Sequence, residues 1–535
     1  MERLTGHPSA AAEAFTAVND LLPVLAWRGL DRVVREENLV RHAAVAREAA
    51  ASAITAGRLE LAVELLERGR ALIWGQSLHI RSDLTALHEV APGLAGRMRE
   101  VRALLADLDN RPAGDAGAAD REAAGQRYRR LAEEWEDLLD RARSIEGFAD
   151  LLVPAPFARL REAARGGPVI VVNVAPRRCD ALIVTIDGVR VVPLPDLTVA
   201  EAERMAAAFL HPTLGTARAP RDLAPHDRPP GPSTPSVLSW LWHAVARPVL
   251  DALGYGAPPA DLHRWPRVWW CPTGPLSALP LHAAGSYPAS ASDAAPGAVP
   301  DRVISSYTPT LDALLRARAP RRTPGPGHGR LLSVGMATTP ATADRPMLPA
   351  LPAVPLELAR IASHWESTTL LSPPLAPAGG APATRQALLD ALGNHGSVHL
   401  ACHGVQDHTR PAASAVHVAD GAVTALELAS LTLPGAQLAF LSACATATGT
   451  SRLPDEAIHM SAALQVAGFR QIVATLWPVR DDLAPELADA FYAYLTRHGV
   501  PRPHDAPVAL HHAVTQLRRR HPDPGLWAPY IHVGP

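Results

Sequence analysis

The first quarter of the chain carries the hydrophobic spacing of amphipathic helices. Apolar residues recur three and four positions apart from Arg58 to about residue 80, and Gly57 stands where a tight turn between two helices needs a glycine. The stretch 121–145 repeats this spacing, with one apolar stripe made of Tyr128, Leu131, Trp135, Leu138 and Ala142. We therefore predict an all-α module over residues 1–150, either a helical repeat or a plain helical bundle, with this stripe buried.

Strand patterns replace the helical ones after residue 150. Short apolar runs at 168–174, 181–186 and 189–194 are typical of strands, and Asp187-Gly188 joins the last two as a hairpin. Proline-rich stretches follow, and from residue 384 helical and strand patterns alternate, which predicts an α/β domain with a largely parallel sheet. The further elements expected are strands at 267–271, 331–335, 397–402, 437–443 and 471–476, a hairpin at 414–423, and helices at 384–392, 455–467, 481–498 and 505–520.

The composition excludes several kinds of enzyme and partner. All 51 basic residues are Arg, so a P-loop lysine, a pyridoxal Schiff base and a kinase strand lysine are excluded. The formal net charge of -2 provides no bulk attraction to nucleic acid or to a membrane. Four cysteines without paired spacing indicate reduced thiols, no signal peptide is expected from the pattern of the first residues, and no apolar run is long enough for a membrane span. We therefore expect a cytoplasmic protein.

Two of the predicted strands end on reactive side chains. The strand at 397–402 is followed by His403 and Gly404, and the strand at 437–443 is followed by Cys444. Because the functional crevice of a parallel sheet lies at the carboxyl edge of its strands, we expect His403 and Cys444 to face each other at roughly 4–7 Å. A thiol beside an imidazole is the minimum unit of nucleophilic catalysis, and Gly404 leaves an unobstructed N–H as an oxyanion donor.

The same residues allow plainer interpretations when each is taken alone. A cysteine at a strand end is usually a small buried hydrophobe, and a lone histidine is usually a core residue. We expect Cys402 to lie in the core and His399 to pack or to support the site. A metal centre made of His399, Cys402 and His403 is not expected, because residues spaced in this way on a strand do not converge.

Several sequence strings resemble the CHAT domain, a family in the caspase–separase clan of cysteine peptidases that often follows tetratricopeptide-like helices. The strings HLACHG (399–404) and LSACAT (441–446) carry the resemblance, together with AGFRQIVATLWPV (467–479) and WAPYIHVG (527–534). Further upstream, CPTGPLSALPLHA (271–283) resembles the family's loop after its early strand, and the helical LLERGRALIWGQSLHIRSDL (65–84) resembles the last helices before CHAT domains in actinobacterial proteins. The resemblance implies a caspase-like α/β domain, with its N-terminal part at 151–330 and its catalytic part at 331–535.

The resemblance also implies an activity and roles for individual residues. It implies a cysteine endopeptidase in which His403 is the general base, Cys444 is the nucleophile, and the N–H groups of Gly404 and Cys444 form the oxyanion hole. The expected partners are a protein substrate and a regulatory protein bound by the helical module, without cofactor, metal, nucleic acid or membrane. The candidates for the substrate pocket are Trp477, Asp407 and Glu456, although core packing of Trp477 is an equal alternative.

Two departures from the family pattern keep a second function open. Ala445 stands where the family often has Glu, and Ser442 stands where metacaspases carry the acid that binds a basic P1 residue. The alternative is a catalytically silent scaffold of CHAT type that binds protein partners. An intact His–Cys pair favours the enzyme.

Overall fold

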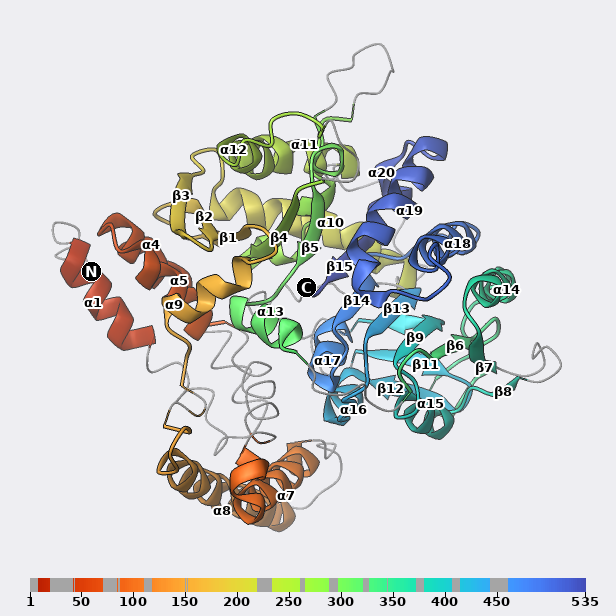
Figure 1. Cartoon of the computed structure of the whole chain (residues 1–535), viewed down its shortest axis with the longest axis horizontal. Helices are drawn as coiled ribbons and strands as arrows, with labels where there is room; N and C mark the ends of the chain where they lie inside the picture. The colour runs from red at the N-terminus through yellow and green to blue at the C-terminus, as the bar shows by residue number, and fades with distance from the viewer. Residues whose placement is uncertain are drawn as a thin grey trace. The chain divides into compact units, whose positions relative to one another are not determined.

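The computed structural model describes most of the chain (Figure 1). The described residues are 8–19, 42, 44–70, 84, 87–109, 118–149, 151, 153–218, 233–259, 265–287, 297–320, 327–343, 345–371, 380–406, 414–442 and 460–535. They fall into two compact units, with residues up to Leu160 in the first and residues from Arg161 in the second. Across these ranges, no helix has the length and apolar character needed to span a bilayer.

The first unit begins with a helical hairpin whose turn depends on a glycine. Its helices are α1 (Pro8–Asn19), α4 (Val45–Thr55), α5 (Leu59–Arg68), α7 (Pro92–Asp109), α8 (Ala118–Arg143) and the short α9 (Phe157–Leu160). Gly57, between α4 and α5, has φ 73°, a left-handed conformation that a side chain disfavours. The predicted helical pair with a tight turn at this position is confirmed. Helix α5 ends at Arg68 with Gly69 at its C-cap, so the single helix predicted from Arg58 to about residue 80 is interrupted there, because glycine favours a helix end. Residues 71–80 lie outside the described residues.

The helices α7 and α8 form a second hairpin around the apolar stripe. Tyr128, Leu131, Trp135, Leu138 and Ala142 are all buried in one cluster that includes Met98 and Val101 from α7. The rim is joined by a bidentate ion pair, in which Arg97 Nε and Nη2 donate to Glu134 at 2.6 and 2.9 Å. The predicted burial of the stripe is confirmed.

We expect the substitution Trp135→Ala to lower the free energy of unfolding of this hairpin by about 3 kcal/mol, because it removes a fully packed aromatic ring and leaves a cavity. Urea unfolding followed by circular dichroism measures this change. The matched control is Asp137→Ala, two positions along the same helix on its exposed side, which should stay within about 0.5 kcal/mol of the wild type. A loss below about 0.5 kcal/mol for Trp135→Ala would contradict its core role.

The second unit is built on one large, mostly parallel sheet. Its strand order is β3-β2-β1-β4-β5-β15-β14-β13-β9-β6-β7-β8. The strands are β1 (Val169–Val174), β2 (Cys179–Thr185), β3 (Gly188–Pro193), β4 (Arg267–Pro272), β5 (Ile304–Tyr307), β6 (Leu331–Gly335), β7 (Ser367–Leu371), β8 (Ala381–Pro382), β9 (Ser397–Ala401), β13 (Leu438–Ser442), β14 (Gln471–Thr475) and β15 (Tyr530–Val533). The predicted α/β class with a largely parallel sheet and a preceding helical region is confirmed.

Helices connect and cover these strands. They are α10 (Val199–Arg218), α11 (Thr234–Leu241), α12 (Arg247–Ala252), α13 (Leu311–Arg318), α14 (Val354–His364), α15 (Arg385–Leu392), α16 (Ala425–Ser430), α17 (Met460–Ala467), α18 (Ala484–Leu495), α19 (Ala506–Arg520) and α20 (Pro524–Trp527). Helices α14, α18 and α19 pack side by side, and α19 also packs on β5, β14 and β15 (Figure 1). This layer of helices covers one side of the sheet. The candidate strands β9 and β13 lie near the middle of the sheet.

Most of the sheet consists of two parallel blocks that run in opposite directions, and β2 and β3 continue it antiparallel beyond β1. Strands β1, β4, β5 and β15 are parallel to one another, and so are the strands from β14 to β8. The blocks meet at β14 and β15, which pair antiparallel. The carboxyl ends of β4 and β9 therefore lie at opposite edges of the sheet. The loop at 271–283, which follows β4, is thus on the edge opposite to His403.

The sequence patterns located many of these elements but missed several. Strands β1 to β4, β6, β9, β13 and β14 lie where they were predicted, within two residues at either end. Strands β5, β7, β8 and β15 and helices α10 to α14, α16 and α20 were not predicted; most of them are short or lie beside proline-rich stretches. The described part of the helix expected at 455–467 begins at Met460. The division of the sheet region at residue 330 stays a prediction, and strands from both sides of it share one sheet.

A buried histidine at the junction of the two blocks makes stability depend on pH. His532 of β15 is 1% exposed; its Nε2 donates to Gln471 Oε1 at 2.7 Å and its Nδ1 accepts from the Ser306 hydroxyl at 2.9 Å. Burial, with the positive charge of Arg267 acting in the same direction, holds the pKa of His532 well below its usual value. Below about pH 6.5 the unfolded chain therefore takes up a proton at this position that the folded chain does not.

The sign of this linkage gives a testable result. Stability is lost as the pH falls below about 6.5, by up to about 1.4 kcal/mol per pH unit for this one histidine. We expect the wild type to lose more unfolding free energy between pH 7 and pH 5 than His532→Gln does, whatever the starting stability of the variant. Urea titrations at both pH values measure the difference. Equal losses in the two proteins would contradict the buried neutral state, and the exposed His504→Gln serves as control.

Candidate functional site

The strands that precede His403 and Cys444 are neighbours in the sheet. Strand β9 pairs parallel with β13, in a register that sets Ala401 opposite Ser442. Both strands are buried along their whole length. His403 follows Ala401 by two residues, and Cys444 follows Ser442 by two residues in the sequence. Cys444 itself lies outside the described residues, so the expected distance between the two side chains stays a prediction.

The ring of His403 is held by a backbone carbonyl. His403 is half-buried, and its Nε2–H donates to the carbonyl oxygen of Pro349 at 2.7 Å. Because a carbonyl oxygen only accepts, this bond assigns the ring proton to Nε2 and leaves a lone pair on Nδ1 in the neutral ring. His403 is therefore oriented as a base that accepts a proton at Nδ1. Sequence analysis missed Pro349, since a backbone carbonyl has no side-chain signature.

Gly404 lies at a position where its backbone N–H is not used by the sheet. Residues Gly404–Val405 form β10 in a small antiparallel sheet with β11 (Ala415–Val418) and β12 (Gly421–Thr424). His417 N–H donates to the His403 carbonyl at 2.9 Å, so the 403–417 pair is hydrogen-bonded and the 404–416 pair next to it is not. The Gly404 N–H therefore points away from β11. This geometry suits a donor to a developing oxyanion.

Two further titratable groups lie close enough to His403 to interact with it electrostatically. Burial lowers the pKa of His417 to about 4, and the charges of Arg345 and His403 act in the same direction, so His417 is neutral near pH 7. Burial raises the pKa of Asp481 above its ordinary value, with a smaller opposing effect of His403. Asp481 Oδ2 accepts the N–H of Ala353 at 2.8 Å, which fixes the start of helix α14.

The strand β9 carries a second histidine in a fully buried polar cluster. His399 has no exposed surface, and Glu357 of α14 and Tyr492 of α18 are almost equally buried. His399 Nε2 lies 3.1 Å from Glu357 Oε1, and His399 Nδ1 lies 3.1 Å from the Tyr492 hydroxyl. The ring also stacks on Phe440 of β13, with centroids 4.8 Å apart. Sequence analysis considered His399 as packing or support, and it missed Glu357 and Tyr492.

Of the three candidates for the substrate pocket, only Trp477 lies among the described residues. Trp477 is 7% exposed, its ring N–H donates to the Gly525 carbonyl at 3.1 Å, and its ring meets Phe209 edge to face at 5.1 Å. These contacts match the core-packing alternative for Trp477. Asp407 and Glu456 lie outside the described residues.

The other three cysteines have the buried surroundings that are typical of structural residues. Cys179, Cys271 and Cys402 are all buried, which matches the core role expected of Cys402. In the described ranges, no three His, Cys, Asp or Glu side chains gather in the manner of a metal site.

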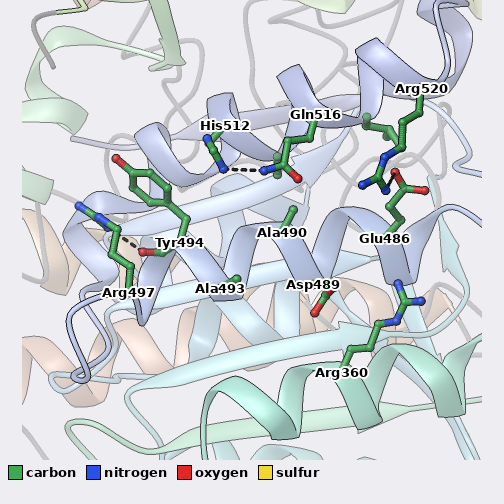
Figure 2. A pocket seen from close by; sticks show the side chains of 12 residues that line it. Arg360, Glu486, Asp489, Ala490, Ala493, Tyr494, Arg497, His512, Gln516 and Arg520 are labelled. Atoms are coloured by element: carbon green, nitrogen blue, oxygen red, sulfur yellow. Dashed lines mark hydrogen bonds and ion pairs between the residues drawn. The ribbon is translucent and has the colours of Figure 1, made fainter. Parts of the chain in front are cut away.

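A separate groove opens on the outer helices, away from the sheet edge. It has a volume of about 470 Å³ and lies along α18 and α19, with Arg360 of α14 at one side (Figure 2). Among its charged groups, Arg520 pairs with Glu486 at 2.7 Å, and Asp489 with His364 at 2.7 Å. The groove contains none of the candidate catalytic residues.

Comparison with known proteins identifies the fold. A model of the CHAT domain matches residues 235–535, which is more than half of the chain. Among solved structures, the chain is similar to separase from Saccharomyces cerevisiae in its complex with securin, at 10% identity and a TM-score of 0.50, with 98% of this chain and 37% of that chain covered. A search among curated proteins found no match.

Two further solved structures are similar at lower scores. A second separase–securin structure from Saccharomyces cerevisiae matches at 9% identity and a TM-score of 0.45, covering 98% of this chain and 48% of that chain. The Arg-specific cysteine proteinase gingipain R matches at 10% identity and a TM-score of 0.35, covering 54% of this chain and 67% of that chain. The chain thus spans less than half of the separase chains, and the separase match at a TM-score of 0.50 shows a likeness of fold alone.

Proposed function

The chain belongs to the CHAT domain family, and we propose that it is a cysteine endopeptidase that hydrolyses peptide bonds in a protein substrate with His403 and Cys444. One observation supports the proposal: β9 and β13 are adjacent and parallel, with Ala401 opposite Ser442, and in the sequence His403 and Cys444 each come two residues after these paired positions. A thiol and its base must follow neighbouring strands at the same carboxyl edge of a sheet if they are to react together. The sequence positions of Cys444 and His403 meet this condition.

The tautomer of His403 supports the role of general base. With its proton on Nε2, donated to the Pro349 carbonyl, the ring takes the Cys444 thiol proton at Nδ1. The carbonyl also stabilises the imidazolium that results, because a charged ring donates a stronger hydrogen bond.

The proposed reaction follows the acyl-transfer sequence of a thiol peptidase. The Cys444 thiolate attacks the scissile carbonyl carbon, and the Gly404 and Cys444 N–H groups donate to the oxyanion. His403 gives its Nδ1 proton to the leaving amine, so the C–N bond breaks and a thioester remains. A water molecule, deprotonated by His403, then hydrolyses the thioester and restores the thiol.

The helical module and the location complete the proposal. In this account the helices of the first unit dock the protein substrate or bind a regulatory protein, and the enzyme acts in the cytoplasm. The support for the location is chemical: free thiols without paired spacing are typical of the cytoplasm, where thiols are kept reduced.

A peptide-library cleavage assay of the wild type against Cys444→Ala tests the proposal. The wild type is expected to cut a subset of peptides, and Cys444→Ala is expected to cut none. Cys179→Ala, which removes a buried thiol distant in sequence from both candidate strands, is the matched control and should retain cleavage. Cleavage that survives in Cys444→Ala would exclude Cys444 as nucleophile, and the catalytically silent scaffold predicts no cleavage by any of the three proteins.

A further inference from the structure

Three polar side chains lie together with almost no exposed surface beneath the candidate site. Glu357 is 2% exposed, and His399 and Tyr492 are completely buried. A carboxylate accepts hydrogen bonds, so His399 donates its Nε2–H to Glu357, and the Tyr492 hydroxyl then donates to His399 Nδ1. Burial, with the charge of Glu357 acting in the same direction, raises the pKa of Tyr492 well above its usual value, so its hydroxyl keeps the proton. Both ring nitrogens of His399 are thus satisfied, one by Glu357 and the other by Tyr492.

Such a cluster is costly compared with apolar packing. Burying a carboxylate and an imidazole in a sheet–helix interface carries a large desolvation penalty, and well-packed apolar residues of similar volume are often equally stable. What a satisfied polar cluster adds over apolar residues is a defined geometry, because its hydrogen bonds tolerate only one arrangement of the elements that carry them. The elements here are β9, α14 and α18.

Two of those elements also hold the general base. Strand β9 leads to His403, and the segment that leads into α14 supplies the Pro349 carbonyl that receives the His403 proton. Pro349 stands eight residues before Glu357, and His399 stands four residues before His403. The strand β9 and the α14 region are therefore joined twice, once by the His399–Glu357 bond and once by the His403–Pro349 bond. Between the two bonds, Asp481 accepts the N–H of Ala353.

We propose that the Glu357–His399–Tyr492 cluster is a positioning device for the general base: it fixes helix α14 against strand β9 so that the Pro349 carbonyl holds His403 with its proton on Nε2. The three residues touch neither substrate nor nucleophile. The inference rests on the proposed function, since this tautomer matters for catalysis only when His403 is the base. It also accounts for the burial of polar groups in a place where packing alone would suffice.

The test follows the side-chain nitrogens of His403 by 15N NMR in protein labelled on histidine, with the signals assigned by their loss in His403→Gln. The wild type is expected to show the Nε2–H tautomer. Tyr492→Phe leaves His399 Nδ1 without its donor, and Glu357→Leu removes the acceptor of Nε2–H, so both are expected to give mixed His403 tautomers. Glu357→Gln keeps an acceptor oxygen and should restore the wild-type signal. Tyr494→Phe, two residues further along α18 on the groove, is the matched control (Figure 2).

The rate of Cys444 alkylation by iodoacetamide provides a second measurement. We expect it to fall on the order of 10-fold in Tyr492→Phe and Glu357→Leu, and to remain near the wild-type rate in Glu357→Gln and Tyr494→Phe. A purely structural cluster predicts lower melting temperatures without any change of tautomer. If Glu357→Leu does not fold, Tyr492→Phe decides the question alone. An unchanged His403 tautomer and an unchanged alkylation rate in folded Tyr492→Phe would overturn the inference.

The NMR measurement separates this inference from the proposed function, because it needs neither Cys444 nor a substrate. If the variants shift the His403 tautomer but the wild type cleaves nothing, the endopeptidase proposal fails and the positioning role remains. If the tautomer is unaffected while His403 still controls Cys444, the positioning role fails and the endopeptidase proposal remains.

Discussion

Replacing His403 by alanine is expected to lower kcat for cleavage of a peptide substrate by about 10³-fold and to leave KM nearly unchanged. The ring removes the thiol proton and returns a proton to the leaving amine, so it acts mainly in the transition states and little in substrate binding. The Pro349 carbonyl cannot replace it, because a carbonyl oxygen has no proton to exchange.

Steady-state kinetics on a peptide identified by the library assay measure both constants. The exposed His504→Ala is the matched control, since it removes an imidazole far along the chain from β9, and it should change kcat by less than about 2-fold. A His403→Ala enzyme with wild-type kcat would contradict the assignment of the base. A raised KM with unchanged kcat would instead assign His403 to substrate binding.

Sequence patterns predicted those elements of the fold that carry long, regular patterns of apolar residues. The stripe around Trp135 has helical spacing over several turns, and it is buried as expected. Strands β9 and β13 are mostly apolar runs, as is typical of strands covered on both faces, and they are buried along their whole length and are neighbours.

The architecture of the sheet could not be predicted in the same way. Strand β15 comes from the last residues of the chain, yet it lies between β5 and β14 and reverses the strand direction. A run of four residues carries no local signal for the strands with which it pairs, because strand pairing is decided by packing across the whole sheet. The division into two opposed parallel blocks follows from that one strand.

The candidate site was predictable only for side chains that carry chemistry themselves. His403 and Gly404 stand out in the sequence because of their types and their place after a strand. Pro349 acts through a backbone carbonyl, and Glu357 meets His399 from 42 positions away in the chain, so neither leaves a local pattern. For Trp477, the sequence left two interpretations open, a pocket wall after β14 and core packing. Its contacts with Phe209 and Gly525 are those of packing.

The reactivity of Cys444 is expected to differ from that of the other three thiols by at least about 100-fold. A cysteine with an ordinary pKa near 8.5 is only a few per cent thiolate at neutral pH, and a histidine that takes the proton raises this fraction. Burial has the opposite effect, because it penalises the charged thiolate and blocks access to the reagent. Cys179, Cys271 and Cys402 are 7%, 0% and 2% exposed, so they are expected to react slowly.

The most direct test of the His403–Cys444 dyad is the rate of iodoacetamide labelling of all four cysteines, measured by peptide mass spectrometry in the wild type and in His403→Ala. It requires neither a known substrate nor an activating partner. The account predicts selective labelling of Cys444 in the wild type, and a rate about 10-fold or more lower at this residue alone in His403→Ala, because the thiolate loses its cationic partner. Labelling of Cys444 at the same rate in both proteins would contradict the dyad and favour a catalytically silent scaffold.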